Sequence, residues 1–485
     1  MLEKTTLFSY LHGVLVEEIE TGHIGHGESL PSAKKLCERY RVGIRTVRDV
    51  LAALREEGYI RTEERRCAVV IYREDVSREN QRAIRALLER RSSVMEMYQT
   101  LAALTPPIFS FGARCCGERA LRQLRNSYQK ASGNSPEGNW QASSAVLHQL
   151  LCHCGSPLLN ELYSSMELYT KVPVFEGYPN PYLEAVRHNP AGFSTVFAVL
   201  VEGLPDQVDR CFAQMYREIG DQVGRYLRDL AADYPQVKED PARFFRWDAE
   251  KGRVCTYTEI GRDLLESIRT GTYADGDFLP PAAVLAERYR VSLSTIRQAL
   301  EMLRQLGLVE VYNGRGTQIT LERMRLSEES VSQAGNRRDT LLYLQGMQFM
   351  VLVLPRVAHL AFSHMERGVA QQVVKAAKGG GDDPLTPLIA AVIKAIPLAS
   401  LRQIVEQINR LLQRGAFLLY LQGRRAQHNI RAVFHLCAEA ANALQAGEEA
   451  LFAPKLTDCY RLILERARQR FIEAGLPGAA EIALP

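Results

Sequence analysis

The sequence contains no apolar run of about 18 residues, the length that a membrane-spanning helix requires. Its longest apolar stretch, near residues 349–354, is much shorter. The N-terminal residues Met1 to Lys4 lead directly into a polar helical pattern and do not resemble a signal peptide. We therefore expect a cytoplasmic protein that does not insert into a membrane.

A strong excess of charge of either sign is also missing. The chain has 60 Lys and Arg residues against 56 Asp and Glu residues, which gives a formal net charge of +4. This balance permits nucleic-acid binding but does not argue for it, so the local placement of arginine must decide. A length of 485 residues exceeds one ordinary hydrophobic core, and several domains are expected.

Motifs for metal binding and catalysis are lacking as well. Ten cysteines without a secretion signal indicate reduced thiols. Residues 115–116 and 152–154 (Cys-Cys and Cys-His-Cys) occupy adjacent or alternate positions, which do not converge on one tetrahedral metal. We expect these thiols to be small buried side chains, and we expect no metal or cofactor. No Ser/His/Asp arrangement or paired-carboxylate motif stands out, so an enzyme is not expected either.

What the sequence does contain is one stretch that occurs twice. Residues 38–42 and 287–291 both have the sequence Glu-Arg-Tyr-Arg-Val. The same shift of 249 residues, from Glu38 to Glu287, aligns glycine, proline, apolar and basic positions on both sides without a gap. This regularity indicates one folded unit present twice. The further matching pairs include Gly22 with Gly271, Gly27 with Gly276, Leu30 with Leu279, Leu36 with Leu285, Thr46 with Thr295, Arg48 with Arg297 and Gly58 with Gly307.

The second copy predicts two helices separated by a turn. Pro31 and Pro280 are expected at the first helical position, where a missing N–H costs nothing. Ser292 can cap the second helix, and Gly307 ends it. The spacing of the apolar residues predicts a buried stripe on the second helix, made of Ile296, Ala299, Leu300 and Leu303.

Two strands are predicted after the second helix, at residues 308–312 and 317–320. The connection Asn313-Gly314-Arg315-Gly316 is typical of a hairpin turn and carries a cation. Helix, turn, helix and basic hairpin together describe a winged helix-turn-helix. The second helix of such a unit fits the major groove of DNA, with its N-terminal side chains at the base edges.

These residues resemble the GntR family of bacterial transcription regulators. The pattern Leu-x-Glu-x-Tyr-x-Val-Ser-x2-Thr-Ile-Arg-x-Ala-Leu, preceded by Gly-x4-Gly-x2-Leu-Pro and followed by Gly-Arg-Gly-Thr, extends over residues 271–317. Residues 22–58 match less completely. Gly43 stands where the second copy has Ser292, and Arg45 stands where it has Ser294. The first hairpin tip, residues 63–67, lacks the glycines of the second, so an altered wing is expected.

The resemblance implies a set of DNA contacts. Arg45, Thr46 and Arg48 would face one half-site, and Ser294, Thr295 and Arg297 would face the other. Arg315, on the turn formed with Gly314, would reach the minor groove or the backbone, and Arg65 or Arg66 would do so less well. Arg39 and Arg288, on the first helix of each motif, are placed for phosphates.

The helical region from residue 76 to about residue 234 resembles the effector-binding domain of the FadR branch of this family. That branch has Asp-x3-His, a later Asn-Pro and two further histidines, and often binds a metal and a small carboxylate. This sequence retains His148, which is our candidate effector contact. Ser144 and Ser156 replace the Asp and Asn, and aromatic residues, Phe193 and Tyr216, stand near the places of the later histidines. A single imidazole cannot hold a divalent metal, so we expect a hydrogen-bonded interior or pocket histidine.

The C-terminal part repeats this helical pattern in diverged form, with Leu388 in the place of His148. We therefore predict a mainly α protein in which two winged helix-turn-helix domains, each with a small β-hairpin, alternate with two all-α helical-bundle domains. The predicted boundaries are residues 1–75, 76–240, 253–322 and 323–485, with a linker at 241–252. This linker contains an aromatic cluster, residues 244–247, which we expect to pack between domains.

The expected function is sequence-specific binding of double-stranded DNA by a transcription regulator. Relatives usually act as homodimers, so a fused tandem would form an intramolecular pseudo-dimer, with further homo-oligomerisation left open. The resemblance implies a small organic acid as effector. One alternative is a non-regulatory interaction protein that kept the fold but lost DNA binding. Another is a pyridoxal-phosphate enzyme half, for which the alternating strand–helix pattern is missing.

Overall fold

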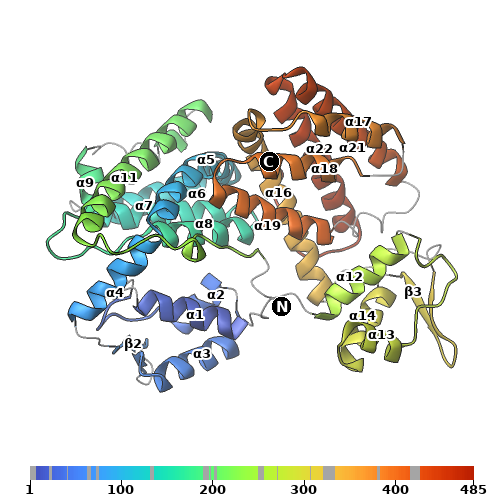
Figure 1. Ribbon diagram of the computed structural model, residues 1–485, viewed down its shortest axis with the longest axis horizontal. Coiled ribbons are helices and arrows are strands. Elements are labelled where there is room, and N and C mark those ends of the chain that lie inside the picture. Colours follow the sequence, from blue (N-terminus) through green and yellow to red (C-terminus); the bar gives the residue numbers. More distant parts are fainter. Residues whose placement is uncertain are drawn as a thin grey trace. The chain divides into compact units, whose positions relative to one another are not determined.

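The computed structural model describes residues 7–20, 24–40, 42–62, 67–72, 76–131, 136–188, 196, 198–200, 205–249, 256–269, 271–305, 307–320, 334–379, 383–415 and 426–485. It divides into two compact units. Unit 1 is Met1–Arg253 with Pro397–Ile404, and unit 2 is Val254–Ile396 with Val405–Pro485. Both are mainly helical, and each contains one small antiparallel hairpin (Figure 1). The predicted fold class is confirmed.

Unit 1 begins with a winged helix. It consists of α1 (Leu7–Glu20), α2 (Ala33–Tyr40), α3 (Ile44–Glu56) and the hairpin of β1 (Ile60–Arg61) with β2 (Val69–Val70). The apolar residues of α1 recur at helical spacing, and α1 packs on α3 through them. Removing these side chains from water is the main stabilising term. The side chains of this core that are at most 1% exposed include Leu11, Leu15, Ile19, Val47, Val50 and Leu54.

Unit 2 begins with the second winged helix. Its elements are α12 (Thr256–Arg269), α13 (Ala282–Tyr289), α14 (Leu293–Gln305), β3 (Val309–Tyr312) and β4 (Gly316–Ile319). As predicted, α14 ends before Gly307, which has a φ of 70°. The predicted buried stripe of α14 is confirmed: Ile296, Ala299, Leu300 and Leu303 are 9% exposed or less.

The duplication extends to individual backbone hydrogen bonds. The N–H of Leu30 donates to the carbonyl of Ala68 over 2.8 Å, and the N–H of Leu279 donates to Thr317 over 2.8 Å. Donors and acceptors are both shifted by the same 249 residues, as Leu30 and Leu279 show. The hairpins obey the shift too, because Ile60 pairs with Val70 and Val309 pairs with Ile319. In both copies the segment that precedes the first helix of the motif is therefore hydrogen-bonded to the wing in the same register.

The expectation that proline occupies the first helical position is wrong. The first helix of each motif begins later, at Ala33 in α2 and at Ala282 in α13. A residue before proline is held in extended backbone, and Pro280 precedes Pro281. Pro281, with φ −50° and ψ 144°, is therefore the N-cap. In the first copy the N–H of Lys35 donates to Ser32 Oγ over 3.3 Å, so Ser32 follows Pro31 as the cap.

The two wings differ in length of pairing. Strands β3 and β4 pair over four residues each, whereas β1 and β2 pair over two. The first wing thus has the same register but a shorter ladder. Its tip, residues 63–66, lies outside the described residues.

The rest of unit 1 is a helical bundle. Its elements are α4 (Val76–Glu89), α5 (Arg91–Cys115), α6 (Glu118–Ala131), α7 (Pro136–Cys152), α8 (Pro157–Thr170), α9 (Pro181–His188), α11 (Pro205–Asp233) and the short 3-10 helix η1 (Pro241–Arg243). Helix α5 packs on α7, α8 and α11. In the interior of the bundle, the centre of the Phe109 ring lies 5.0 Å from that of the Tyr163 ring and 5.4 Å from that of the Phe212 ring.

The segment after α11, which includes most of the predicted linker, packs against this bundle. Phe245 and Trp247 are 6% and 5% exposed. The N–H of Phe245 donates to Ser93 Oγ over 3.1 Å, and its ring lies 5.1 Å from that of Tyr169. The aromatic cluster therefore packs within unit 1, against helices α5 and α8, whereas the sequence had predicted packing between domains.

The helices of unit 2 after its winged helix are α16 (Ala334–Phe362), α17 (Gly368–Gly379), α18 (Leu385–Ala395), α19 (Ala399–Gly415), α21 (Ala426–Ala446) and α22 (Glu449–Glu473). Although the sequence has no uninterrupted apolar run of about 18 residues, helix α16 is by length and mean hydropathy apolar enough to cross a membrane, which the sequence had not predicted; 78% of that stretch is buried inside the protein. It packs on α18 and α22, as the central helix of a bundle does.

Candidate nucleic-acid interface

Helix α14 has a side-chain N-cap, which is Ser292. Ser292 Oγ accepts the N–H of Thr295 over 3.2 Å, so the predicted cap is confirmed. The same hydroxyl lies 2.7 Å from Ser294 Oγ and 2.8 Å from Thr295 Oγ1. Because the apolar stripe faces the core, Ser294 and Arg297 are left exposed on the opposite side. The predicted contact residues of the second copy thus lie together on one surface.

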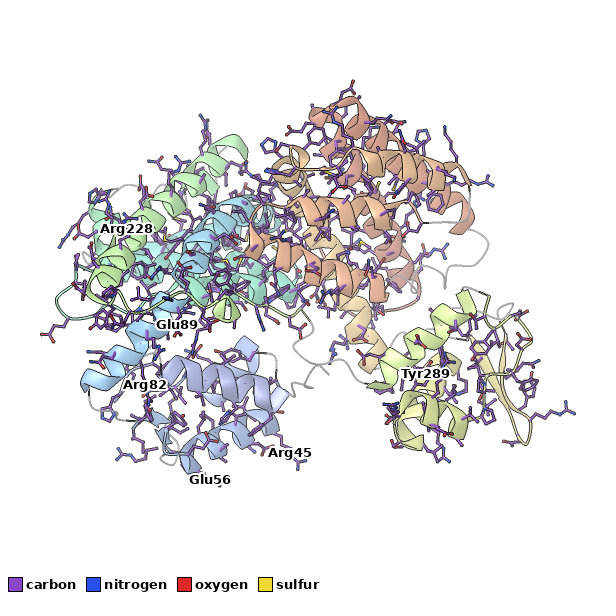
Figure 2. The ribbon with its side chains drawn as sticks, viewed as in Figure 1. Arg45, Glu56, Arg82, Glu89, Arg228 and Tyr289 are labelled. Carbon is purple, nitrogen blue, oxygen red and sulfur yellow. The ribbon has the colours of Figure 1, made fainter. Side chains whose placement is uncertain are left out.

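The N-terminus of α3 has more charge and a weaker cap. Its N-cap is Gly43, which offers no side-chain acceptor. Arg45 and Arg48 are both exposed and, three residues apart on a helix, lie on the same face, with the half-buried Thr46 between them in sequence. Arg45 projects outward from the winged helix (Figure 2).

These cations are available to an anionic partner. Within the part of the chain that the structure describes, no carboxylate forms an ion pair with Arg45, Arg48 or Arg297. A guanidinium presents a planar fork of donors that matches guanine or phosphate oxygens. The surface at each helix N-terminus can therefore accept DNA without first breaking an internal salt bridge.

The second wing presents a cation at its tip. Gly314 and Gly316 have φ values of 76° and 115°, which favour glycine and allow the tight turn. The N–H of Arg315 donates to the carbonyl of Tyr312 over 3.1 Å, which leaves the exposed Arg315 side chain at the turn. The predicted counterparts Arg65 and Arg66 lie outside the described residues.

Arg288, on α13, is anchored by aromatic side chains. Its Nη1 donates to the Tyr273 hydroxyl over 3.3 Å, and its guanidinium lies 5.4 Å from the ring centre of Tyr289. Tyr289, and then Tyr273, raise the pKa of Arg288. The Tyr289 hydroxyl in turn donates to Asp263 of α12. The Arg288 guanidinium is thus exposed and is held in place by Tyr273 and Tyr289, which suits contact with a phosphate. The side chain of Arg39 lies outside the described residues.

Two exposed apolar residues, one at the start of each recognition helix, were not among the predicted contact residues. Ile44 and Leu293 are the first residues of α3 and α14, and they are 46% and 45% exposed. The signal was present in the sequence, because both follow the capping residue and are related by the shift of the duplication.

His148 lies in a polar network between α7 and α8. Its Nδ1 is 2.7 Å from Asn160 Oδ1, and its Nε2 is 2.9 Å from Glu167 Oε2. Ser144 Oγ donates to the other oxygen of Glu167 over 2.6 Å. Both ring nitrogens face oxygen atoms, an arrangement that suits the protonated imidazole. The Tyr163 ring lies 4.9 Å from the His148 ring and closes this half-buried site.

This network does not fit the metal that the FadR resemblance implies. Both nitrogens of His148 are occupied by Asn160 and Glu167, and Ser144 supplies a hydroxyl in place of a carboxylate. Among the described residues, no group of three or more His, Cys, Asp or Glu side chains is arranged to hold a metal ion. Tyr216 is buried on α11, whereas Phe193 lies outside the described residues.

The bundle of unit 1 also has a groove of about 580 Å³ between α6 and α7. Its lining includes Gln123, Ser127, Gln149 and His153, but not His148 or its hydrogen-bonding partners. The groove and the His148 network are therefore separate features of the same bundle.

Comparison with known proteins identifies the two winged helices. The family model described as "Bacterial regulatory proteins, gntR family" matches residues 12–70 and 256–319. The Uxu operon regulator of Haemophilus influenzae is 35% identical over 82 residues, which cover 16% of this chain and 31% of that protein. The Exu regulon transcriptional regulator of Escherichia coli K12 is 36% identical over 69 residues, covering 14% and 27%.

The match thus spans less than a third of the length of these curated relatives. Among solved structures, Streptococcus agalactiae GntR aligns with a TM-score of 0.21 and 17% identity, over 43% of this chain and 99% of that chain. A TM-score this low adds nothing to the sequence match.

Proposed function

The chain belongs to the gntR family of bacterial regulatory proteins through two separate segments, and on that premise we propose that it is a sequence-specific DNA-binding transcription regulator in the cytoplasm. The family is one of regulators and not of enzymes. The observation that supports the proposal best is the second winged helix, which has a capped α14, exposed Arg297 and a complete wing carrying Arg315.

We propose further that one chain supplies both DNA-reading domains of an operator. A symmetric dimer presents identical surfaces to a palindrome, whereas a fused duplicate is free to diverge. The two surfaces do differ, because Arg45 of α3 corresponds to Ser294 of α14, and the uncapped Gly43 corresponds to Ser292. Unlike surfaces favour an operator with two unlike half-sites, and pairing of whole chains is the competing arrangement.

Within this proposal the residues have distinct roles. Arg45, Thr46 and Arg48 contact bases of one half-site, and Ser294, Thr295 and Arg297 contact those of the other. Arg315 contacts the backbone or minor groove beside the second half-site, and Arg65 or Arg66 does so beside the first. Arg39 and Arg288 contact phosphates, which adds affinity without specificity.

The His148 network supports a proposal for an effector. A small organic acid could take the place of Glu167 opposite the imidazole and the Ser144 hydroxyl, since its carboxylate offers the same two acceptor oxygens. Glu167 would then be released on binding, and α7 and α8 would lose a contact. The second bundle has the buried Leu388 at the equivalent place, so only the first bundle would respond.

The second candidate function is a non-regulatory interaction protein that has lost DNA binding. The shorter ladder of the first wing favours it, because fewer paired residues hold this hairpin than the second one. Specific binding that weakens steeply with salt would argue against it, since each phosphate contact releases a counterion.

The deciding experiment is selection of bound duplexes from a random pool by the full chain, by Arg48→Ala and by Arg297→Ala. We expect an asymmetric site, with each variant relaxing the base preference of one half-site only. Each lost guanine contact should reduce discrimination by about 1–3 kcal/mol. Arg228→Ala, which removes an exposed arginine from α11 (Figure 2), is the control for loss of charge alone.

Other outcomes have defined meanings. A palindrome sensitive only to Arg297→Ala would refute the single-chain pseudo-dimer and indicate dimers that read DNA through the second winged helix. Failure to enrich any duplex, across low and moderate salt, would refute DNA binding by this chain alone. Loss of the same preference in Arg228→Ala would show that the effect is electrostatic and not specific.

A further inference from the structure

The first residues of the two recognition helices share an unusual property. Ile44 and Leu293 are large aliphatic side chains with 46% and 45% of their surface exposed, although Val47 and Ile296, three residues further on, are completely buried. Close to half of the surface of Ile44 and of Leu293 is thus not covered by packing within the winged helix. Both side chains instead add apolar surface to the exposed, N-terminal end of the helix.

One exposed aliphatic residue is ordinary for a protein surface. The pair is more informative, because the positions on either side have diverged between the copies while the aliphatic character has not. Gly43 corresponds to Ser292, and Arg45 corresponds to Ser294. The polar chemistry of the two surfaces has changed, but a branched C4 side chain, β-branched in Ile44 and γ-branched in Leu293, remains at the start of each helix.

We propose that Ile44 and Leu293 each contact the 5-methyl group of a thymine in the major groove, so that each half-site requires an A·T pair in one orientation at one position. This inference rests on the proposed DNA-binding function and specifies part of its base recognition. The thymine methyl is the apolar group that base pairs present in the major groove, and apolar side chains recognise it. The N-terminal residues of a recognition helix are those that face the base edges.

The surroundings of each side chain suit this contact. Arg45 and Arg48 are exposed beside Ile44, and Arg297 is exposed on the same side of α14 as Leu293. Guanidinium groups bind guanine or phosphate, which brings the helix end close to the bases. An aliphatic residue among them would lose its remaining water contact on binding. Burial against a methyl group contributes a factor of about four in affinity, on the scale of one buried methylene.

The test replaces thymine by deoxyuridine in a duplex selected by the full chain. Deoxyuridine keeps every hydrogen-bonding group of thymine and lacks only the methyl. We expect binding to weaken about fourfold to tenfold at one thymine in each half-site and to stay unchanged at the others. This substitution alters the DNA alone, so folding of a protein variant does not enter the result.

Protein variants then assign each methyl to a residue. With Leu293→Ala the deoxyuridine effect should vanish in one half-site and persist in the other, and Ile44→Ala should give the reverse. Leu451→Ala is the matched control, because Leu451 on α22 is 50% exposed and should leave both effects intact.

Two results would overturn the inference and are distinguishable. If the selected duplex binds equally well with deoxyuridine at every thymine, the methyl contact is refuted while DNA binding stands. If the methyl effect survives Ile44→Ala and Leu293→Ala together, other residues make the contact. Absence of any selected duplex would instead refute the proposed function on which the inference rests.

Discussion

The unequal caps of the two recognition helices allow a sharp prediction about local stability. Ser292 Oγ accepts the Thr295 N–H over 3.2 Å at the start of α14, whereas Gly43 offers no acceptor at the start of α3. We expect Ser292→Ala to destabilise the second winged helix and Gly43→Ser to stabilise the first. Each change should leave the other copy unaffected.

The magnitudes follow from the geometry. Loss of a serine N-cap to alanine costs about 1 kcal/mol, within a range of 0.5–2 kcal/mol. Gly43 has φ −65° and ψ 151°, which any residue adopts, and an added Cβ meets nothing within 4 Å. Serine therefore fits at position 43 without strain. Because glycine is itself a fair N-cap, the cap formed in Gly43→Ser should contribute only a few tenths of a kcal/mol, and the stiffer unfolded chain should add up to about 1 kcal/mol.

Hydrogen exchange of the full chain, followed by mass spectrometry, measures the two copies separately. A loss of 1 kcal/mol corresponds to about fivefold faster exchange of protected α14 amides when exchange proceeds through local opening. The control is Ser292→Gly, which should cost only a few tenths of a kcal/mol because glycine is tolerated as a cap. Equal exchange of α14 in Ser292→Ala and the unmodified chain would refute the reasoning, as would a change confined to α3.

Two further predictions concern the core and the polar network. Leu303→Ala and its counterpart Leu54→Ala each remove a completely buried side chain and should cost about 2–5 kcal/mol, with hydrogen exchange rising only in the affected winged helix; a rise in both copies would contradict independent cores. Glu167→Gln should strengthen binding of a small carboxylic acid to the bundle of unit 1, because the amide competes less well for the His148 imidazole. Calorimetry of a panel of organic acids would measure this, with Glu184→Gln as control, and identical or absent binding in both variants would refute an effector at His148.

Several features were predictable from the sequence because they are local or periodic. The shift of 249 residues, the apolar spacing of α1 and α14, the Ser292 cap and the glycines of the second wing depend on neighbouring residues alone. Such patterns determine which helix face is buried and where a turn is allowed. The exposed arginines of the candidate interface followed directly, since they lie opposite the apolar stripe.

Other features were decided only by the tertiary structure. Glu167 and Asn160 face His148 because α8 packs on α7. The spacing of these residues in the sequence does not indicate that the Glu167 carboxylate lies against the imidazole, at the place where the FadR branch has a metal. Phe245 is buried because its ring packs on Tyr169 of α8 while Ser93 of α5 accepts its backbone N–H. Helix α13 begins later than predicted because Pro280 is followed by Pro281. A residue before proline is held in extended backbone, so Pro280 cannot begin the helix.

The sequence by itself thus determined that this is a duplicated winged-helix protein and which helix face of each copy is left exposed for the proposed DNA contact, because helix periodicity and turn chemistry act over a few residues. The tertiary structure decided how buried polar groups are paired and which apolar residues, such as Ile44 and Leu293, keep close to half of their surface exposed. Pairing and burial depend on side chains far apart in the chain, which meet only when the helices pack.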